Sequence, residues 1–289
     1  MSTPDTAVNT DLPNNLIGEF SFSSASPKQL AWQDIKQSFI HWRIWMMLAY
    51  QDIKLRYRRS LLGPFWITIS MAITVYSMGY LYSYLFRIPF SEYFPYLMGG
   101  MLGWSLISNA IPDLVDTFLA HDSMIKQIKL PYTLYVHKVA ARNFMIFFHN
   151  FLIVIPVMII FHNQITVDWH LLLLLPGLAI LYLNCFCYGL IFAIIGGRYR
   201  DISQIIKSLV QIVFFVTPIM WKPSVLPASK QFIVFLNPVY ALIELVRAPL
   251  VGYAPSAMNM VMLFITSVIG MIFSYLLFVS RRARIIYWL

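Results

Sequence analysis

The strongest constraint on the fold of this chain is an uncharged stretch that begins directly after a basic cluster. The cluster consists of Arg56, Arg58 and Arg59, and no Asp, Glu, Lys or Arg follows it until Arg87. At about 1.5 Å of rise per residue, a helix of this length is long enough to cross a bilayer core of about 30 Å. We therefore expect a membrane protein whose first crossing lies within residues 60–86.

The composition supports a chain whose main solvent is the bilayer. Of its 289 residues, 59% are hydrophobic and only 11% are charged, which lies outside the range of soluble globular domains. The net charge of +9 could suggest nucleic acid, but the basic residues lie next to apolar runs instead of forming one polar surface. We expect no nucleic-acid partner.

Further apolar runs bring the expected number of crossings to six. They cover residues 94–112, 143–162, 171–195, 208–221 and 257–279. Positively charged loops are retained in the cytoplasm, and a six-crossing topology places nearly all of the 21 Lys and Arg residues on one side. The exceptions are Arg87, Lys222, Lys230 and Arg247, which this topology does not place on the cytoplasmic side. The sequence thus predicts a multi-pass protein with cytoplasmic N- and C-termini.

The segment between the fifth and sixth crossings is apolar in places, yet we expect no seventh crossing there. A seventh would put the C-terminal arginines outside, and five prolines divide residues 222–259 into pieces too short to span. We predict two short re-entrant helices, near residues 232–236 and 239–251, that dip in from the outer side and return. Their ends must be buried by protein.

The region before the first crossing divides into two parts. Residues 1–27 are rich in polar residues and predict a mobile cytoplasmic tail. Residues 28–59 predict an amphipathic helix in the headgroup layer, and a helix packed on a partner subunit is the alternative. Its apolar positions recur at steps of three or four, at Ile35, Phe39, Trp42, Met46, Ala49 and Ile53. Residues 60–289 would form the six-helix transmembrane domain.

The polar stretch between the second and third crossings has weak helical spacing. Leu114, Phe118 and Ile125 share this spacing, and Pro131 would end the helix. A helix across the cytoplasmic face is what a soluble motor subunit would push against, although a solvated loop helix fits equally well. No stretch matches the phosphate-loop pattern Gly-x-x-x-x-Gly-Lys-Ser/Thr, so any ATP would be handled by a partner.

A series of short motifs resembles the transmembrane subunits of bacterial ABC exporters of surface polysaccharide, a family that includes O-antigen, capsule and teichoic acid exporters. The stretch LRYRRSLLGPFW, residues 55–66, is similar to the motif before the first crossing in that family. Similar patterns follow in family order: LGWSLISN at 102–109, IKQIKLP at 125–131, RYRDI at 198–202, TPIMW at 217–221 and LNPVY at 236–240.

The resemblance implies an all-α permease that forms a homodimer and binds two separate ABC ATPase subunits. It would export a lipid-linked polysaccharide across the bacterial cytoplasmic (inner) membrane, within membrane lipid. No cofactor is implied on this chain, because ATP and Mg²⁺ would bind the ATPase. The short helices after Trp221 would form an outer gate region, and the first and fifth crossings would line the path.

The resemblance also implies roles for two groups of cytoplasmic residues. A coupling helix within residues 113–130 would transmit closure of the ATPase to the transmembrane helices. Its candidate residues are Asp113, Asp116, Phe118, Asp122, Ile125 and Lys126. A cytoplasmic loop with Arg198, Arg200 and Asp201 would lie near the ATPase.

Basic residues suit the substrate entrance on chemical grounds. Arg56, Arg58 and Arg59 could hold the diphosphate of a lipid-linked donor, because guanidinium groups bind phosphate bidentately. The alternative is that they anchor the helix against phospholipid headgroups.

Aromatic residues of the first crossing are candidates to line the path, because sugars present flat C–H faces to aromatic rings. These candidates are Trp66, Tyr76, Tyr80 and Tyr84. The three tyrosines recur every four residues and would form one stripe. An interfacial aromatic belt or helix packing is the alternative.

Two other functions remain open from the sequence. A drug or small-lipid exporter of the same broad ABC permease class would share the topology without the polysaccharide-type motifs. An intramembrane prenyl or phosphosugar transferase would use clustered carboxylates to bind magnesium diphosphate. Asp113, Asp116 and Asp122 form one cluster, but the second cytoplasmic loop supplies only Asp201.

Overall fold

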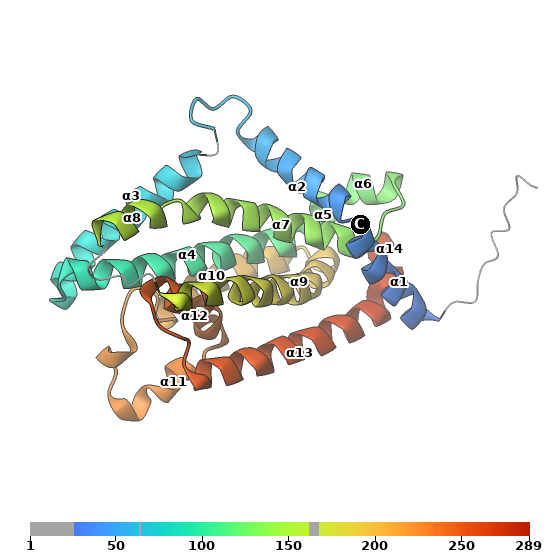
Figure 1. The fold of residues 1–289 in the computed structure, drawn as a ribbon. Coiled ribbons are helices and arrows are strands. Elements are labelled where there is room, and N and C mark those ends of the chain that lie inside the picture. The colour runs from blue at the N-terminus through green and yellow to red at the C-terminus, as the bar shows by residue number, and fades with distance from the viewer. Residues whose placement is uncertain (1–25, 64, 162–167) are drawn as a thin grey trace, which may run out of the picture.

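The computed structural model describes residues 26–63, 65–161 and 168–289, and this part of the chain is helical without any strand (Figure 1). The all-α prediction is confirmed, while nearly all of the predicted tail lies outside the described residues. The elements are α1 (Pro27–Ile40), α2 (Trp42–Arg56), α3 (Phe65–Phe86), α4 (Phe90–Val115), α5 (Thr117–Ala120), α6 (Asp122–Gln127), α7 (Tyr132–Phe151), α8 (Val154–Ile160), η1 (Trp169–Leu173), α9 (Leu174–Arg198), α10 (Asp201–Val216), η2 (Pro223–Val225), η3 (Ala228–Lys230), α11 (Phe232–Phe235), α12 (Pro238–Val251), α13 (Ala257–Arg281), η4 (Arg282–Arg284) and α14 (Ile285–Trp288).

Helices lie at all six predicted crossing positions, but length and composition identify four of them as membrane-spanning in the described chain. These are α3, α7 with α8, α9 with η1, and α13 with the C-terminal turns. The fifth predicted crossing, α10, has only 16 residues. The second, α4, is the central helix, with most of its side chains buried against other helices. A helix surrounded by protein does not need the hydropathy of a lipid-facing one.

The position of α4 depends on close contact with α12, which packs along it. Two glycines permit this contact. A Cβ atom at Gly99 would lie 3.0 Å from the Cα of Arg247, and one at Gly103 would lie 3.3 Å from the Cα of Ile243. Either distance is tighter than an ordinary carbon–carbon contact of about 3.5–4.0 Å, so a side chain here would push α12 away. The long helices α4, α7 and α9 run side by side, and each contacts the other two (Figure 1).

The segment after Trp221 contains the two short helices that the sequence predicts. They are α11 and α12, which meet at a bend of 88°. Asn237 between them accepts hydrogen bonds from the backbone N–H groups of Val239 and Tyr240 and so caps α12. The chain then turns back at Gly252, whose φ of 98° lies in the left-handed region. This geometry fits either a broken span or a re-entrant loop.

The predicted amphipathic helix is two helices, α1 and α2, with a break at His41. Both pack on α7, and α1 also contacts α13. The expected stripe is confirmed in part: Ala49 and Ile53 are buried, whereas Phe39 and Trp42 are exposed and Asp34 and Trp45 are buried in their place. Local spacing could not show this, because α1 is positioned by polar contacts to residues distant in the sequence.

Asp34 makes these contacts. Its carboxylate accepts hydrogen bonds from the backbone N–H groups of Tyr132 and Thr133, at 3.2 and 3.1 Å, at the first turn of α7. It also pairs with Arg282 at 3.0 Å. A carboxylate at a helix N-terminus satisfies free N–H groups and interacts favourably with the helix dipole. The N-terminal helices are therefore part of the bundle at the end where the C-terminus lies.

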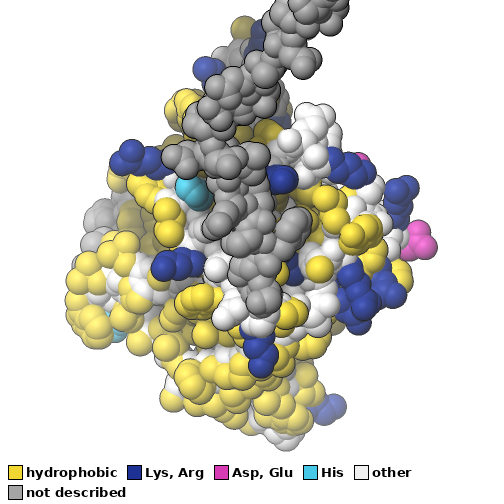
Figure 2. All heavy atoms as spheres, turned by 90° about the vertical axis from the view of Figure 1, so that its right-hand side faces the viewer, with side chains coloured by type: hydrophobic (Ala, Val, Ile, Leu, Met, Phe, Trp, Pro, Cys, Tyr) yellow, Lys and Arg dark blue, Asp and Glu magenta, His cyan; other side chains and the backbone are white. Residues whose placement is uncertain are grey.

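Basic side chains gather at this same end of the molecule. Figure 2 views the end that holds α1, α6 and the C-terminus, and Lys and Arg side chains surround it. This is the distribution that the positive-inside rule associates with a cytoplasmic end.

Candidate functional site

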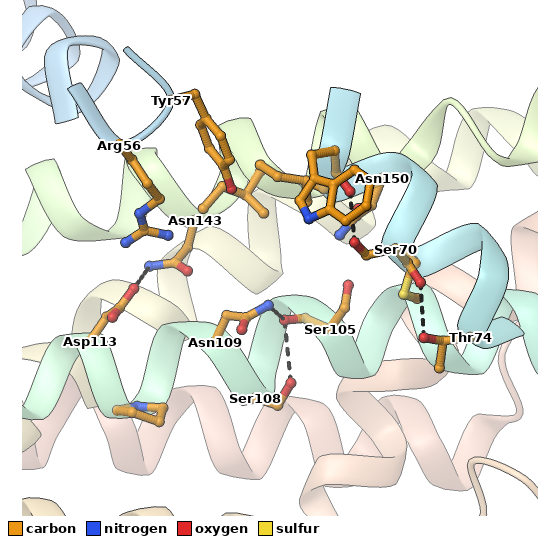
Figure 3. Close-up of a pocket in the computed structure, with 15 residues that line it drawn as sticks. Arg56, Tyr57, Ser70, Thr74, Ser105, Ser108, Asn109, Asp113, Asn143 and Asn150 are labelled. Carbon is orange, nitrogen blue, oxygen red and sulfur yellow. Dashed lines mark hydrogen bonds between the residues drawn. The ribbon is translucent and has the colours of Figure 1, made fainter. Parts of the chain in front are cut away.

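A polar pocket lies between the end of α2 and the helices α3, α4 and α7 (Figure 3). Its volume is about 510 Å³. Hydroxyl and amide side chains line part of its wall, namely Ser70, Thr74, Ser105, Ser108, Asn109, Asn143 and Asn150. A second hollow of about 580 Å³ adjoins it, because Thr74 and Ser108 line both, and this hollow extends to α10. Polar groups that line a cavity in an apolar bundle indicate a candidate ligand path.

The hydroxyl groups of the pocket are held by their own helices. Ser70 donates to the carbonyl of Trp66 at 2.8 Å, and Ser105 donates to that of Leu102 at 2.8 Å. The Asn109 amide donates to the carbonyl of Ser105 at 2.7 Å. Because each hydroxyl hydrogen is used within its helix, the remaining lone pairs make the wall rich in hydrogen-bond acceptors.

Two residues predicted for the entrance and the path line this pocket. Arg56 ends α2 and extends toward Asn143 and Asp113 (Figure 3), and Trp66 lies on the first turn of α3. Arg58 and Arg59 are exposed in the turn that follows α2 and do not line the pocket. The arginine cluster is therefore split between a pocket residue and two surface residues.

The predicted tyrosine stripe is also split. Tyr76 is half-buried and packs on Phe94, with ring centroids 4.7 Å apart. Tyr80 and Tyr84 are exposed and contact each other edge to face at 5.1 Å. Tyr76 therefore has a packing role, and a path-lining role for the other two stays a prediction.

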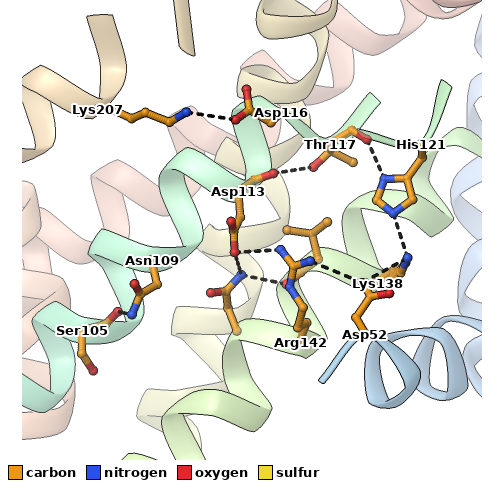
Figure 4. A network of polar contacts seen from close by, with 12 residues as sticks. Asp52, Ser105, Asn109, Asp113, Asp116, Thr117, His121, Lys138, Arg142 and Lys207 are labelled. Carbon is orange, nitrogen blue, oxygen red and sulfur yellow. Dashed lines mark hydrogen bonds and ion pairs between the residues drawn. The ribbon is translucent and has the colours of Figure 1, made fainter. Parts of the chain in front are cut away.

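A network of charged side chains extends from the pocket toward the basic end (Figure 4). Asp113 accepts from the Asn143 amide at 3.0 Å and pairs with Arg142 at 2.7 Å. Arg142 also pairs with Asp52 of α2 at 3.3 Å, and Lys138 pairs with Asp52 at 3.1 Å. The network joins α2, α4 and α7 through partly buried pairs, which are screened less than surface pairs.

His121 ends this network between α5 and α6. Lys138 Nζ lies 2.8 Å from His121 Nε2, and His121 Nδ1 lies 2.7 Å from the carbonyl of Thr117. Because an ammonium group can only donate, Nε2 must accept and Nδ1 must carry the proton. Burial lowers the pKa of His121, and the nearby Lys138 charge lowers it further. His121 is thus held as the neutral tautomer.

The predicted coupling segment is not one helix. Asp113 belongs to the end of α4, Asp116 and His121 interrupt the helical run, and α5 and α6 are separate turns. Phe118 is fully buried, and a Cβ atom at Gly197 of α9 would lie 3.6 Å from it. Ile125 is buried as well, so both apolar candidates anchor the segment.

The charged candidates of this segment lie nearer to solvent. Asp122 and Lys126 form a partly exposed pair at 2.7 Å on α6. Asp116 pairs with Lys207 of α10 at 3.3 Å. Arg198 ends α9 over the ring of Trp288, Arg200 is exposed, and Asp201 begins α10. The predicted coupling segment and cytoplasmic loop therefore lie close together, and their roles stay predictions.

The same contacts argue against a shared metal site on the three acidic residues. Asp113, Asp116 and Asp122 each face a different cation, Arg142, Lys207 and Lys126 in turn, so their carboxylates do not converge. Over the described ranges, no group of three or more metal-binding side chains comes together.

Several site residues were missed from the sequence. The pocket amides and Asp52 belong to helices whose relative placement no local pattern reveals. Lys138 and Arg142 are spaced by four on α7, which was a usable signal for a shared partner. A buried pair of Glu244 and Arg247 on α12, spaced by three in an apolar run, was a second such signal.

An apolar helical bundle that encloses a partly polar pocket and gathers many of its basic side chains at one end defines the transmembrane domain of a multi-pass membrane protein. The chain belongs to the ABC-2 type transporter family, whose sequence model matches residues 43–251. This is a family of transport permeases.

Three relatives named as O-antigen export system permease protein RfbA are similar to this chain over most of its length. One from Klebsiella pneumoniae is 22% identical over 204 residues, covering 68% of this chain and 76% of the relative. Another from the same organism is 21% identical, covering 78% and 88%. A third, from Myxococcus xanthus, is 23% identical, covering 81% and 91%.

Proposed function

We propose that this chain is the transmembrane subunit of an ATP-driven exporter that moves a lipid-linked polysaccharide, such as O-antigen, out across the bacterial inner membrane. The observation that carries the proposal is family membership together with relatives named as O-antigen export permeases over most of the chain. The chain would cross the membrane six times, with both termini in the cytoplasm.

The hydroxyl and amide side chains of the pocket are compatible with a glycan as the substrate. They offer hydrogen bonds to a ligand with many hydroxyls. Arg56 and Trp66 at the pocket would contribute a phosphate-binding cation and an aromatic surface.

The proposed working assembly is a homodimer with two ABC ATPase subunits, which bind ATP and Mg²⁺. The ATPase would contact α5, α6 and the turn at Arg198–Asp201. Closure of the ATPase would move this segment, and the pairs Asp116–Lys207 and Asp113–Arg142 connect it to α10 and α7. The helices α3 and α10 would border the path, since both adjoin the hollows beside α4.

Deletion of the chain in its native host tests the proposal. We expect loss of surface polysaccharide and accumulation of its lipid-linked precursor in the cells, with both restored by the wild-type chain. The tagged chain should co-purify with a stoichiometric subunit that carries the phosphate-loop motif. Altered drug sensitivity with normal surface polysaccharide would favour the efflux alternative, and a lone chain without an ATPase would contradict both.

A further inference from the structure

An apolar cavity lies on the side of α4 that points away from the polar pocket. Its volume is about 220 Å³, and α4, α9, α12 and α13 all contribute to its wall. On α4, Ile107 and Leu114 line the cavity, whereas Ser105 and Pro112 line the polar pocket. Residues two apart on a helix point to nearly opposite sides, so α4 separates the two spaces.

The cavity exists because α12 fills only part of a groove. Both α9 and α12 pack on α4 and on α13, so the four helices surround a common space. Ile243 of α12 lies beside Gly103 of α4, and α12 begins nearby at Pro238. Since the two helices are antiparallel, the groove continues beyond the start of α12 toward the end of α4 at Val115. The cavity lies along this continuation.

The polar side chains of the wall direct their donors into the protein. The Tyr188 hydroxyl donates to the carbonyl of Thr266 at 2.9 Å, and the Thr266 hydroxyl donates to that of Met262 at 2.7 Å. The Asn184 amide donates to Ser267 Oγ at 2.8 Å. All other residues of the wall are Leu, Ile, Val, Ala, Phe, Pro, Gly or Cys. An apolar cavity of about 150 Å³ already stays dry and binds a molecule such as benzene, so this space suits an apolar ligand.

The cavity is continuous with an exposed apolar surface. Pro238 on its rim is exposed. Thr266 of its wall stands on α13 between Ile265 and Ile269, which are 43% and 56% exposed. In the proposed homodimer α3 and α10 border the path, and neither helix contributes a residue to this wall. With the second copy placed there by the proposed function, the exposed face of the spanning helix α13 meets lipid.

The depth of the cavity matches the hydrocarbon core of the bilayer. Arg198 at the basic end of α9 marks the level of the headgroups. On α9 the cavity extends from Phe192 to Leu181, about 9–25 Å from Arg198 by the helical rise. The hydrocarbon core is about 30 Å thick, so the whole range lies within it. A soluble subunit does not reach this depth, whereas acyl chains surround it.

We propose that this cavity holds one acyl chain of a membrane phospholipid whose headgroup lies at the basic end. The chain would enter between α4 and α13 and fill the part of the groove that α12 leaves open. There it would pack on the first turn of α12, where Pro238, Val239 and Leu242 line the cavity. A bound lipid thus buries the end of a helix that stops inside the membrane.

Photochemical labelling tests the site. The probe is a phosphatidylcholine with a diazirine in the middle of one acyl chain, mixed into phosphatidylcholine nanodiscs. These hold the chain as purified from native membranes, with any subunit that accompanies it. We expect adducts on the buried residues Leu106, Ala110 and Leu114 of α4, in addition to adducts on α13 around the exposed Phe264. Adducts on α13 alone would overturn the proposal, as when a second copy covers the cavity.

A variant that fills the cavity provides the second test. Ala110→Phe should lose the adducts on α4 and keep those around Phe264. Leu183→Phe is the matched control, because Leu183 is 38% exposed on α9 and does not line the cavity. This control should keep the adducts on α4. Retained labelling of α4 in Ala110→Phe, or an equal loss in Leu183→Phe, would overturn the proposal.

Melting temperatures show whether the filled variants still fold. Ala110→Leu should leave the melting temperature in detergent unchanged or higher, because the added atoms enter free space. Ala140→Leu on α7 should lower it, because Ala140 is also buried but does not line the cavity. An equal fall in both variants would contradict the cavity. These measurements require no transport, so their failure leaves polysaccharide export, and with it the proposed function, unaffected.

Discussion

Among individual residues, Arg247 is the largest fully buried side chain in the part of the chain that the structure describes. It is fully buried and pairs with Glu244, and its guanidinium donates to the carbonyl of Pro218 at 2.8 Å. The ring of Tyr96 lies 4.1 Å from it. Because these contacts come from α4, α12 and the turn that follows α10, one side chain joins three segments. The sequence showed Arg247 only as an exception to the charge rule; Glu244 three residues earlier was a local signal, but Tyr96 and Pro218 lie far away along the chain.

Removal of this arginine should destabilise the protein strongly. In Arg247→Met, Glu244 would remain buried without its cation, a loss of about 3–5 kcal/mol for a broken buried pair. The double variant Arg247→Met with Glu244→Gln should recover most of the loss, because no uncompensated charge remains. Thermal unfolding in detergent would measure both. A double variant no more stable than the single one would contradict this account.

His121 predicts a specific dependence of stability on pH. Burial lowers its pKa in the folded protein, whereas the unfolded chain has an ordinary value of about 6.5. Between these two pKa values the unfolded state binds more protons, so stability falls as the pH decreases below about 7. His121→Gln keeps an acceptor for Lys138 but cannot titrate. The melting temperature of this variant should fall less than that of the wild type between pH 7 and pH 5. Parallel plots of melting temperature against pH for the two proteins would contradict the prediction.

At the scale of elements, the sequence predicted the long helices and missed the breaks. Uncharged apolar runs were sufficient to locate α3, α9 and α13. The breaks at His41 and Asp116 were missed, because the helical spacing of apolar residues continues across both. A Cβ at Gly196 would lie only 2.2 Å from the carbonyl oxygen of Val115, so α9 passes directly against the end of α4. Such contacts between helices decide where a helix ends, and they leave no local signal.

The coupling role of α6 is tested by breaking that helix. Lys126→Pro removes a backbone hydrogen bond and costs the helix about 3 kcal/mol. Because Lys126 is exposed, membrane insertion and the bundle should remain intact. Polysaccharide export should fall to background, while Lys126→Ala, which also removes the pair with Asp122, should keep most of it. Export assays in the deletion host would show this, and normal export by the proline variant would refute the coupling assignment.

For the whole molecule, the chain leaves apolar helices uncovered on the side of the two hollows. The α10 helix has no buried residue, and little of α3 is buried. Hydropathy cannot separate a lipid-facing surface from a subunit interface, since both are apolar. The predicted homodimer places α3 and α10 beside the path, so their exposed faces would meet the second copy near the two-fold axis.

Cysteine cross-linking distinguishes these surfaces. In an isologous dimer, a residue near the axis faces its own copy, so one cysteine can form a disulfide between protomers. With Cys185 and Cys187 replaced by alanine, Phe215→Cys on α10 should yield a covalent dimer after mild oxidation in membranes. Phe264→Cys on α13 is the matched control, because its side chain is 70% exposed compared with 72% for Phe215. Random collision in the bilayer would cross-link both variants equally, whereas an interface at α10 cross-links only the first.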